Sequence, residues 1–544
     1  MDNENGYILA MYDVRGIQKY IFRTPDLKSA IGASALVEGI IERALKESLS
    51  LYEEQTGKVL RKDLDWYVEG EGPKAYQEDT YDVQVLYIGG GNAFVVYRNI
   101  QTERSDSKTG GFGSVESFSG SLASSINRLM AKYVLESTYS LQLAVAMVKK
   151  TDDYQADQQN VRREMDQVKR SMSAATPFGA TPAVKIDGRT GYPLTAHGDR
   201  EELSTEARNK RNAAARKRWY YLEDEKKIDS LRTKKGVDST IAVIHIDGNN
   251  LGLRIRSLLK DKGTYQEGVS TQRLISYRID HSYKAAFERM KQLTEAVGKT
   301  SRQLSIKEKD IFVIPVVTAG DDITYVCNGQ LALMSVQFFA REISRCSMAE
   351  TPTDQDDGRY SFSICAGIAF ANSHFPFHIA YDVAEECCGN AKKTAKSKEN
   401  LQGERIGNWV DFHICKNVQA RNLKVLREKE YVTSLGEELL IRPYYIACGT
   451  EKEGTVLGNL AKGTRTLESL AKSIVYFAEG ERIPRSYAKL LRNTYPMGKY
   501  EVKHLCAFLQ SRKHLMPDGS FKMYEGNQAL WYDALEMMDL FATL

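Results

Sequence analysis

The chain has 544 residues, of which 42% are hydrophobic and 27% charged, a composition typical of globular proteins that bury several cores. Its 75 basic and 71 acidic residues give a formal net charge of +4, which argues against a strongly basic protein that binds nucleic acid over its whole surface. No apolar stretch approaches the ~18 residues expected of a membrane-spanning helix.

The eight cysteines all lie at or after Cys327, and no two of them form a C-x-x-C pair. The N-terminal residues show no basic lead-in of a secretory signal. Together these features predict reduced thiols in a cytoplasmic protein without a membrane partner or a structural zinc site.

Residues 1–150 carry the pattern of a first α+β domain. A strand over 7–14 ends near Asp13, a helical pattern covers 27–51, and two strand-like runs flank a triple glycine. A helical segment and the strand LQLAVAMV complete the order β-α-β-β-α-β, which is ferredoxin-like.

Residues 151–236 form a highly charged connecting module. We expect helices around a short hairpin, whose turn signal is DGRTG. The basic run from Arg208 to Arg218 is most simply a solvated helix face, and a phosphate or nucleic-acid role is the alternative.

Residues 237–416 repeat the first order. A strand over 240–247 ends at Asp247, and a hairpin reads VVTAGDDITYVC; helices surround it, and a last helix carries AKKTAK. Residues 417–544 are predicted to form an α-helical C-terminal domain. The predicted fold class is therefore α+β, with two ferredoxin-like domains, the connecting module and a helical domain.

The two ferredoxin-like domains differ at their hairpin tips. When the hairpins are aligned by their apolar strands, Gly89 falls opposite Gly320 and Phe94 opposite Tyr325. This alignment places Gly90 and Gly91 where the second domain has Asp321 and Asp322, and Asp13 where it has Asp247. A turn needs no carboxylates, so the acidic tip points to a metal site, whereas the glycine tip leaves room for a nucleotide.

In this fold the first strand lies beside the hairpin, so Asp247 is expected next to Asp321 and Asp322. Three converging carboxylates repel one another unless a cation is present, and hard oxygen ligands suit Mg²⁺ or Mn²⁺. Two such ions ~4 Å apart serve phosphoryl or nucleotidyl transfer. The predicted catalytic residues are Asp247, Asp321 and Asp322, and the predicted metal-binding set adds Ile246.

Other residues near these carboxylates are candidates for nucleotide binding. The turn after Asp247 offers backbone N–H groups to a triphosphate, and lysines on the last helix offer counter-charges, with a solvated helix end as the alternative for the lysines. The candidates outside the glycine tip are Gly248, Asn249, Asn250, Gly320, Lys392 and Lys393.

Six segments together resemble the Cas-ten family, the large subunit of type III CRISPR effector complexes. They read DVRGIQKYIF, IGASALVEG, YIGGGN, HIDGNNLG, AGDD and AGIAF…HFPFHIAYDVAEE…AKK. The resemblance covers most of the chain and implies two palm domains that are similar to GGDEF cyclases. It also implies conversion of ATP into cyclic oligoadenylates after RNA recognition, together with other effector subunits and guide and target RNA.

The resemblance also assigns residues. The family's GGDD motif maps onto Ala319, Gly320, Asp321 and Asp322, and its GAS motif maps onto Gly32, Ala33 and Ser34. The similar serine of the second palm is Ser276, and both serines would lie near adenine.

Three departures from the family stand out. The chain starts directly at the first palm without an HD nuclease pair, its connecting module lacks cysteine pairs, and Ala319 replaces a glycine. We therefore expect no DNase activity and no zinc site, but retained cyclase chemistry.

Several alternatives stay open at this level. One is a non-catalytic scaffold subunit, and another is a GGDEF-type cyclase that uses GTP. The third is a stand-alone synthase of a cyclic dinucleotide or of an ATP–metabolite conjugate, for which a homo-oligomer would be the expected assembly. The preference for ATP rests on the resemblance alone.

Overall fold

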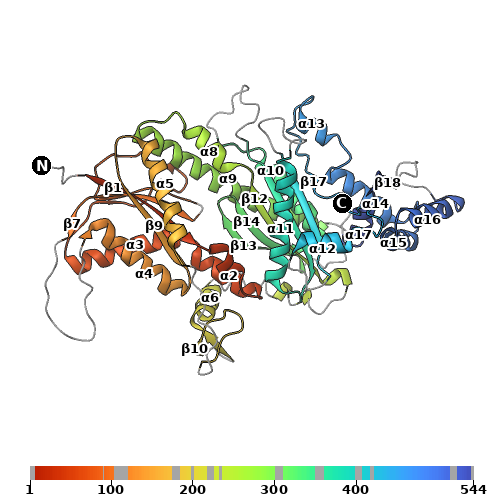
Figure 1. The fold of residues 1–544 in the computed structure, drawn as a ribbon, viewed down its shortest axis with the longest axis horizontal. Helices are drawn as coiled ribbons and strands as arrows, with labels where there is room; N and C mark the ends of the chain where they lie inside the picture. The colour runs from red at the N-terminus through yellow and green to blue at the C-terminus, as the bar shows by residue number, and fades with distance from the viewer. Residues whose placement is uncertain are drawn as a thin grey trace. The chain divides into compact units, whose positions relative to one another are not determined.

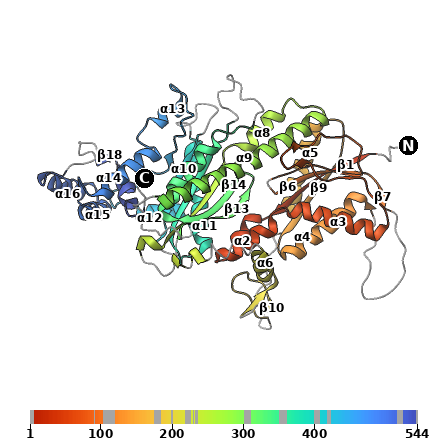
Figure 2. The same ribbon diagram turned by 180° about the vertical axis from the view of Figure 1, so that it is seen from behind.

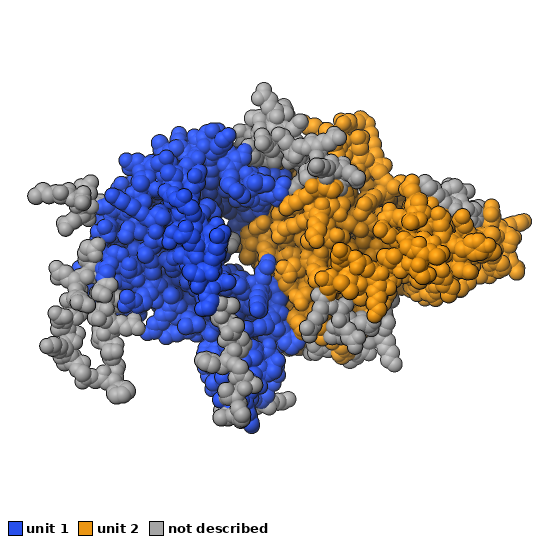
Figure 3. Space-filling view, viewed as in Figure 1, with its two compact units in different colours: residues 1–218, 250–281 blue, residues 219–249, 282–544 orange. Residues whose placement is uncertain are grey.

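The computed structural model describes residues 6–89, 91–102, 120–173, 184–197, 201–216, 226–228, 230–231, 236–300, 310–348, 361–397, 407–416, 422–514 and 523–540. The chain divides into two compact units, one of residues 1–218 with 250–281 and one of residues 219–249 with 282–544 (Figure 3). The long helix α9 (Tyr265–Thr300) contributes residues to both units.

Unit 1 contains a five-stranded sheet in the order β2-β5-β6-β1-β9. Only the short β2 runs parallel to its neighbour, and the other four strands form the antiparallel ferredoxin-like arrangement. The strands are β1 (Tyr7–Arg15), β2 (Lys62–Asp63), β5 (Val83–Gly89), β6 (Asn92–Arg98) and β9 (Gln142–Lys149).

Helices cover both faces of this sheet (Figures 1 and 2). On one face α3 (Ile40–Thr56) and α4 (Leu122–Thr138) pack together, and Asn127 of α4 accepts a hydrogen bond from Tyr12. Helix α5 (Tyr154–Ser171) contacts β9 and β1, and its Lys169 reaches the neighbouring residue Asp13, so α5 lies on the opposite face.

The remaining elements of unit 1 include the connecting module. Its short hairpin of β10 and β11 leads into α6, which packs against α2. These elements are α1 (Ile17–Phe22), α2 (Leu27–Val37), β3 (Tyr67–Val68), β4 (Gly72–Pro73), β7 (Gln101–Thr102), β8 (Gly120–Ser121), β10 (Leu194–His197), β11 (Glu202–Ser204), α6 (Thr205–Arg216) and α8 (Leu251–Leu259).

The prediction that the basic run on α6 is a solvated helix face was wrong for part of the run. Lys210 is fully buried, forms an ion pair of 2.8 Å with the equally buried Glu206, and donates a hydrogen bond of 2.7 Å to the Tyr20 carbonyl. The reason is a tight helix crossing, because a Cβ added to Gly32 of α2 would lie 1.9 Å from the Lys210 carbonyl oxygen. Residues 217 and 218 lie outside the described residues.

Unit 2 contains a six-stranded sheet in the order β13-β14-β12-β15-β16-β17. Its first four strands repeat the antiparallel arrangement of unit 1, and β16 runs parallel to β15. The strands are β12 (Thr240–Gly248), β13 (Val313–Ala319), β14 (Asp322–Asn328), β15 (Ile364–Asn372), β16 (Trp409–Ile414) and β17 (Tyr444–Tyr445).

Helix α11 (Phe377–Ala395) contacts β15, β16 and β12, and α10 (Ala332–Ile343) follows the hairpin (Figure 1). The C-terminal residues are mainly helical, as predicted. Their elements are α12 (Leu423–Glu430), α13 (Val456–Ala461), α14 (Leu467–Glu479), α15 (Arg485–Thr494), α16 (Lys499–Ser511), β18 (Tyr524–Glu525), β19 (Gln528–Ala529) and α17 (Tyr532–Met537). None of the described helices is both long and apolar enough to span a membrane.

Candidate active site

The three predicted carboxylates lie at one edge of the unit 2 sheet. Ala319 pairs with Asp322 to close the β13–β14 hairpin, so Gly320 and Asp321 form its tip. Gly320 has a φ of 61°, a conformation that glycine adopts without strain. Ile246 of β12 pairs with Ile323 of β14, which places the next residue, Asp247, opposite Asp322.

Burial and the charges of neighbouring residues shift the pKa values in this site. Burial raises the pKa of Asp321 to about 6, and the negative charges of Asp247 and Asp322 add to this, while Lys392 opposes it. The Lys392 ammonium forms an ion pair with the Asp247 carboxylate. Burial alone lowers the pKa of Lys392, but the Asp247 carboxylate outweighs that effect and raises it.

The donor chemistry fits a hard divalent cation, although no three His, Cys, Asp or Glu side chains of the described residues are close enough together to hold one. All three candidate ligands are carboxylates. Burial, followed by the charges of Asp247 and Asp322, raises the pKa of Asp321, and the single Lys392 ammonium offsets this only in part. Metal binding would therefore require the Lys392 side chain to leave Asp247.

Helix α11 reaches the site because β15 has a glycine beneath it. A Cβ added to Gly367 would lie 1.9 Å from the Ala384 carbonyl oxygen and 2.4 Å from the Cys388 nitrogen. Because of this close approach, the face of α11 that carries Tyr381, Cys388 and Lys392 lies against the sheet. The absence of a side chain at Gly367 therefore allows α11 to lie close enough for Lys392 to contact Asp247.

The turn after β12 is held mainly by structural contacts. Gly248 ends the strand and pairs with Ile364. Asn249 is 1% exposed, its N–H donates to the Ser363 carbonyl at 2.9 Å, and its Nδ2 donates to the Gly407 carbonyl at 3.0 Å. Asn250 precedes α8 with a φ of 55°. Asn249 therefore fastens the loop, and its buried side chain faces the protein.

Two other predicted residues differ in exposure. Lys393 is exposed on α11, one position beyond Lys392. Ile246 is fully buried and has strand partners on both sides.

A family model for the second palm domain of Cas10/Cmr2 matches residues 240–402. Over these residues the chain is similar to that palm domain. The match spans β12, the acidic hairpin and α11, and so includes Asp247, Asp321, Asp322 and Lys392.

Solved structures resemble the chain over nearly its whole length, at low identity. The apo Csm1–Csm4 cassette has 12% identity and a TM-score of 0.47, with 100% of this chain and 70% of that chain covered. Csm1 in T. onnurineus has 12% identity, a TM-score of 0.47 and coverage of 99% and 70%. The Csm1–Csm4 subcomplex of the type III-A CRISPR-Csm interference complex has 12% identity, a TM-score of 0.48 and coverage of 98% and 70%. No curated protein sequence matches the chain.

The strand registers of the two hairpins correct our alignment of them. Gly89 pairs with Asn92 as Ala319 pairs with Asp322, so Gly91 corresponds to Asp321 and Asn92 to Asp322. The prediction was wrong by one residue because the strands of both hairpins are mainly apolar and buried on both faces, so their sequences give little alternation to fix the register. Phe94 consequently corresponds to Thr324, not to Tyr325.

The predicted nucleotide-binding residues of unit 1 fall into two places. Gly89 lies at the end of β5 near Ser276 of α9, whose Cβ and Oγ are each 3.9 Å from a Cβ added to Gly89. Ser276 Oγ accepts a hydrogen bond of 3.2 Å from Gln272. Gly91 has a φ of 79°, and Gly90 lies outside the described residues.

The predicted GAS motif lies on α2. Gly32 and Ala33 are buried, and Gly32 serves the crossing with α6, so neither offers a surface to a nucleotide. Ser34 is half-buried.

Unit 1 also retains a counterpart of the Asp247–Lys392 pair. Asp13 forms an ion pair of 2.7 Å with Lys169 of α5. Asp13 lies opposite Asn92, as Asp247 lies opposite Asp322, and each lysine lies fifteen residues after the first residue of its helix. The two domains thus share this ion pair and differ at the hairpin acids.

The sequence analysis missed His245, which is 3% exposed on β12 beside Asp322 and Thr324. The available signal was alternation along the strand, since His245 and Asp247 are two residues apart and share a face.

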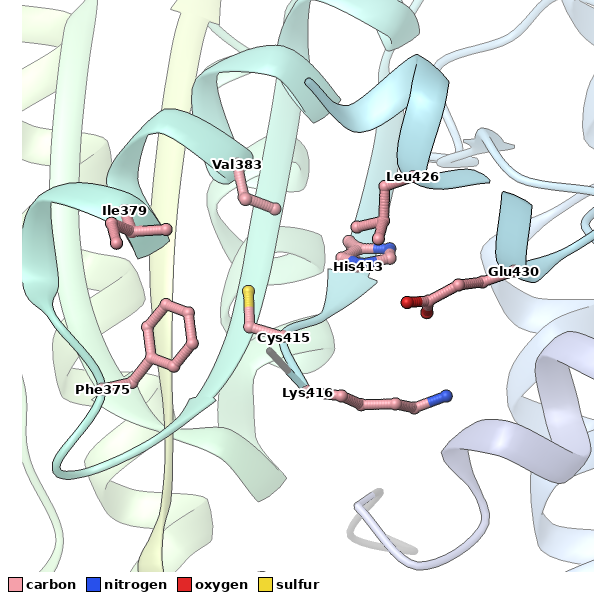
Figure 4. Close-up of a pocket in the computed structure, with 8 residues that line it drawn as sticks. All are labelled: Phe375, Ile379, Val383, His413, Cys415, Lys416, Leu426 and Glu430. Carbon is pink, nitrogen blue, oxygen red and sulfur yellow. The ribbon is translucent and has the colours of Figure 1, made fainter. Parts of the chain in front are cut away.

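One pocket lies on another part of unit 2. Figure 4 shows it between α11, β16 and α12. It is lined by Phe375, Ile379, Val383, His413, Cys415, Lys416, Leu426 and Glu430, none of which is a predicted site residue.

Proposed function

We propose that this chain is a Mg²⁺- or Mn²⁺-dependent nucleotidyltransferase that converts ATP into a cyclic oligoadenylate messenger in a type III CRISPR-like defence. The observation that supports this proposal is the gathering of Asp247, Asp321 and Asp322 with Lys392 at one sheet edge of a second palm domain. Other effector subunits with guide and target RNA are the proposed partners.

In this proposal Asp247, Asp321 and Asp322 would hold two divalent ions, which would supply charge neutralisation at the reacting phosphate and its leaving group. The 3′-hydroxyl oxygen of one nucleotide forms a bond to the α-phosphorus of the next. The bond from that phosphorus to the β-phosphate bridging oxygen breaks, pyrophosphate leaves, and the hydroxyl proton passes to solvent.

The chain's own residues then have distinct tasks. Lys392, which pairs with Asp247 in this structure, would be free to contact a phosphate oxygen once a cation neutralised that carboxylate. Asp321, with a pKa near 6, is largely ionised at neutral pH and is ready to accept a cation.

The deciding experiment compares the wild-type chain with the Asp321→Ala/Asp322→Ala double variant. Each is incubated with ATP and Mg²⁺, with and without RNA, and the products are analysed by mass spectrometry. We expect cyclic adenylates from the wild type and none from the double variant, with both proteins folded by circular dichroism. Asp382→Ala, which removes an exposed carboxylate from α11, is the control and should keep activity. Unreacted ATP under every condition would sink the proposal.

The same product analysis separates the alternatives. A cyclic dinucleotide or an ATP–metabolite conjugate would indicate a stand-alone synthase, and preference for GTP would indicate a GGDEF-type cyclase. Absence of thermal stabilisation by ATP with Mn²⁺ would favour a non-catalytic scaffold, since a ligand stabilises the state that it binds.

A further inference from the structure

His245 occupies a fixed position behind the acidic hairpin of the second palm domain. It lies on β12 directly opposite Thr324 of β14 and opposite Gly367 of β15. Its ring packs edge-to-face against Tyr381 of α11, with ring centroids 5.6 Å apart and an interplanar angle of 77°. Strand neighbours and the helix above therefore restrict the imidazole, which is 3% exposed.

The Nδ1 atom of this ring is directed to polar atoms of β14. It lies 3.2 Å from Thr324 Oγ1, at hydrogen-bond distance, and 3.5 Å from Asp322 Oδ1. In the tautomer that carries its proton on Nδ1, this N–H would stabilise the Asp322 carboxylate in one orientation without taking the place of a ligand on its outer side.

The first palm-like domain supports a link between this histidine and the hairpin acid. At the places of His245 and Thr324 it has Met11 and Phe94, which face each other across β1 and β6. At the place of Asp322 it has Asn92. The copy without the acid therefore also lacks the polar pair behind it.

We propose that His245 is a positioning residue that orients Asp322 for metal binding through its Nδ1 side. This inference rests on the proposed function, because it needs a metal ion at the carboxylates. Removal of a group that orients a metal ligand typically weakens metal affinity about 10- to 100-fold, and we expect that range here.

The test uses three substitutions at one position in the full-length chain. His245→Asn places an amide N–H near the position of Nδ1, His245→Gln places one near Nε2, and His245→Leu removes both. Affinity for Mn²⁺ is measured by isothermal titration calorimetry, and the melting temperature is measured without metal. The matched control is His413→Leu, because His413 is 1% exposed on β16 and packs edge-to-face on Tyr431 at 5.8 Å.

We expect His245→Leu and His245→Gln to weaken Mn²⁺ binding about 10-fold or more, His245→Asn to keep wild-type affinity, and His413→Leu to keep it even if its melting temperature falls as much. Three results would overturn the inference: wild-type affinity in His245→Leu, an equal loss of affinity in His245→Asn, or an equal loss in His413→Leu. If Asp321→Ala/Asp322→Ala still abolishes Mn²⁺ binding in that case, the proposed function stands and only the role of His245 is refuted. If the wild type binds no Mn²⁺, or the double variant binds it normally, both the inference and the proposed function fail.

Discussion

Asp321 lies at the tip of a hairpin where its charge is unfavourable in the metal-free protein. Burial, with the neighbouring Asp247 and Asp322, raises its pKa to about 6 from an ordinary value of 3.8. The folded protein thus binds this proton more tightly than the unfolded chain does, so stability falls as the pH rises from about 4 to 6 and stays lower above that. Under the proposed function, the acidic tip lowers the stability of the protein whenever no cation is bound.

Asp321→Asn should therefore stabilise the metal-free protein at pH 7.5 and leave its stability nearly unchanged at pH 4. A pKa raised from 3.8 to about 6 corresponds to roughly 3 kcal/mol, so the expected gain is on the order of 1–3 kcal/mol. Thermal melts at the two pH values, without metal and with Mn²⁺, make the measurement. Mn²⁺ should stabilise the wild type only, and a variant less stable than wild type at pH 7.5 without metal would contradict the electrostatic account.

The acidic residues were predictable from the sequence, whereas their surroundings were not. Comparison of the two hairpins singled out Asp321 and Asp322, and the strand order predicted their closeness to Asp247. The one-residue alignment error arose because mainly apolar strands that are buried on both faces give little alternation to fix their register. His245 could have been found, because it lies two residues before Asp247 and therefore shares its face of the strand.

At the scale of elements, α11 is the part that joins the fold to the site. It lies close to β15 because Gly367 has no side chain, and that approach carries Lys392 to Asp247. Interiors are close-packed, so a methyl group inserted there must displace the helix.

Gly367→Ala should destabilise unit 2 by about 1–3 kcal/mol, the usual cost of overpacking, and should weaken Mn²⁺ binding because α11 moves. Urea denaturation and calorimetry measure the two effects. The control is Gly389→Ala, since Gly389 lies in α11 itself and an added Cβ there meets nothing within 4 Å. It should be neutral or stabilising, since alanine favours helix by about 1 kcal/mol over glycine. Equal behaviour of the two variants would refute the packing argument.

Both sheets have more strands than the sequence pattern predicted. Two four-stranded sheets were predicted, and the structure adds β2 to one and β16 with β17 to the other. Strand β17 has only two residues, and β2 likewise, so neither carries a periodic signal. Strand β16 contains the buried Asp411 and His413, which interrupt its apolar pattern and are explained only by partners distant in sequence.

At the scale of the molecule, buried charges fasten the C-terminal helices of unit 2 to its sheet. The Arg442 guanidinium is fully buried, lies 4.2 Å from the Phe412 ring centroid, and donates to the Phe412 carbonyl at 2.6 Å. It also pairs with Asp533 and Glu536 of α17. The C-terminal residues therefore complete the core of unit 2, although they lie outside the family match.

Arg442→Met should destabilise the protein by about 3–5 kcal/mol, because buried Asp533 loses its cation and Glu536 keeps only its ion pair with the more exposed Lys416. Arg485→Met, which breaks the more exposed ion pair with Asp539, should cost at most about 1 kcal/mol. Chemical denaturation gives these values, and hydrogen exchange should show the loss of protection in β16 and α17 first. A small effect of Arg442→Met would mean that the C-terminal helices are held in another way.

The ion pair between Asp13 and Lys169 has a consequence for the charge of each sheet edge. In unit 1 this pair lies beside Gly91 and Asn92, which carry no charge, so its two charges balance each other. In unit 2 the equivalent pair lies beside two further carboxylates, and its single ammonium leaves a net negative charge there. A difference of two residues at a hairpin tip therefore separates an electrically balanced edge from one that attracts cations.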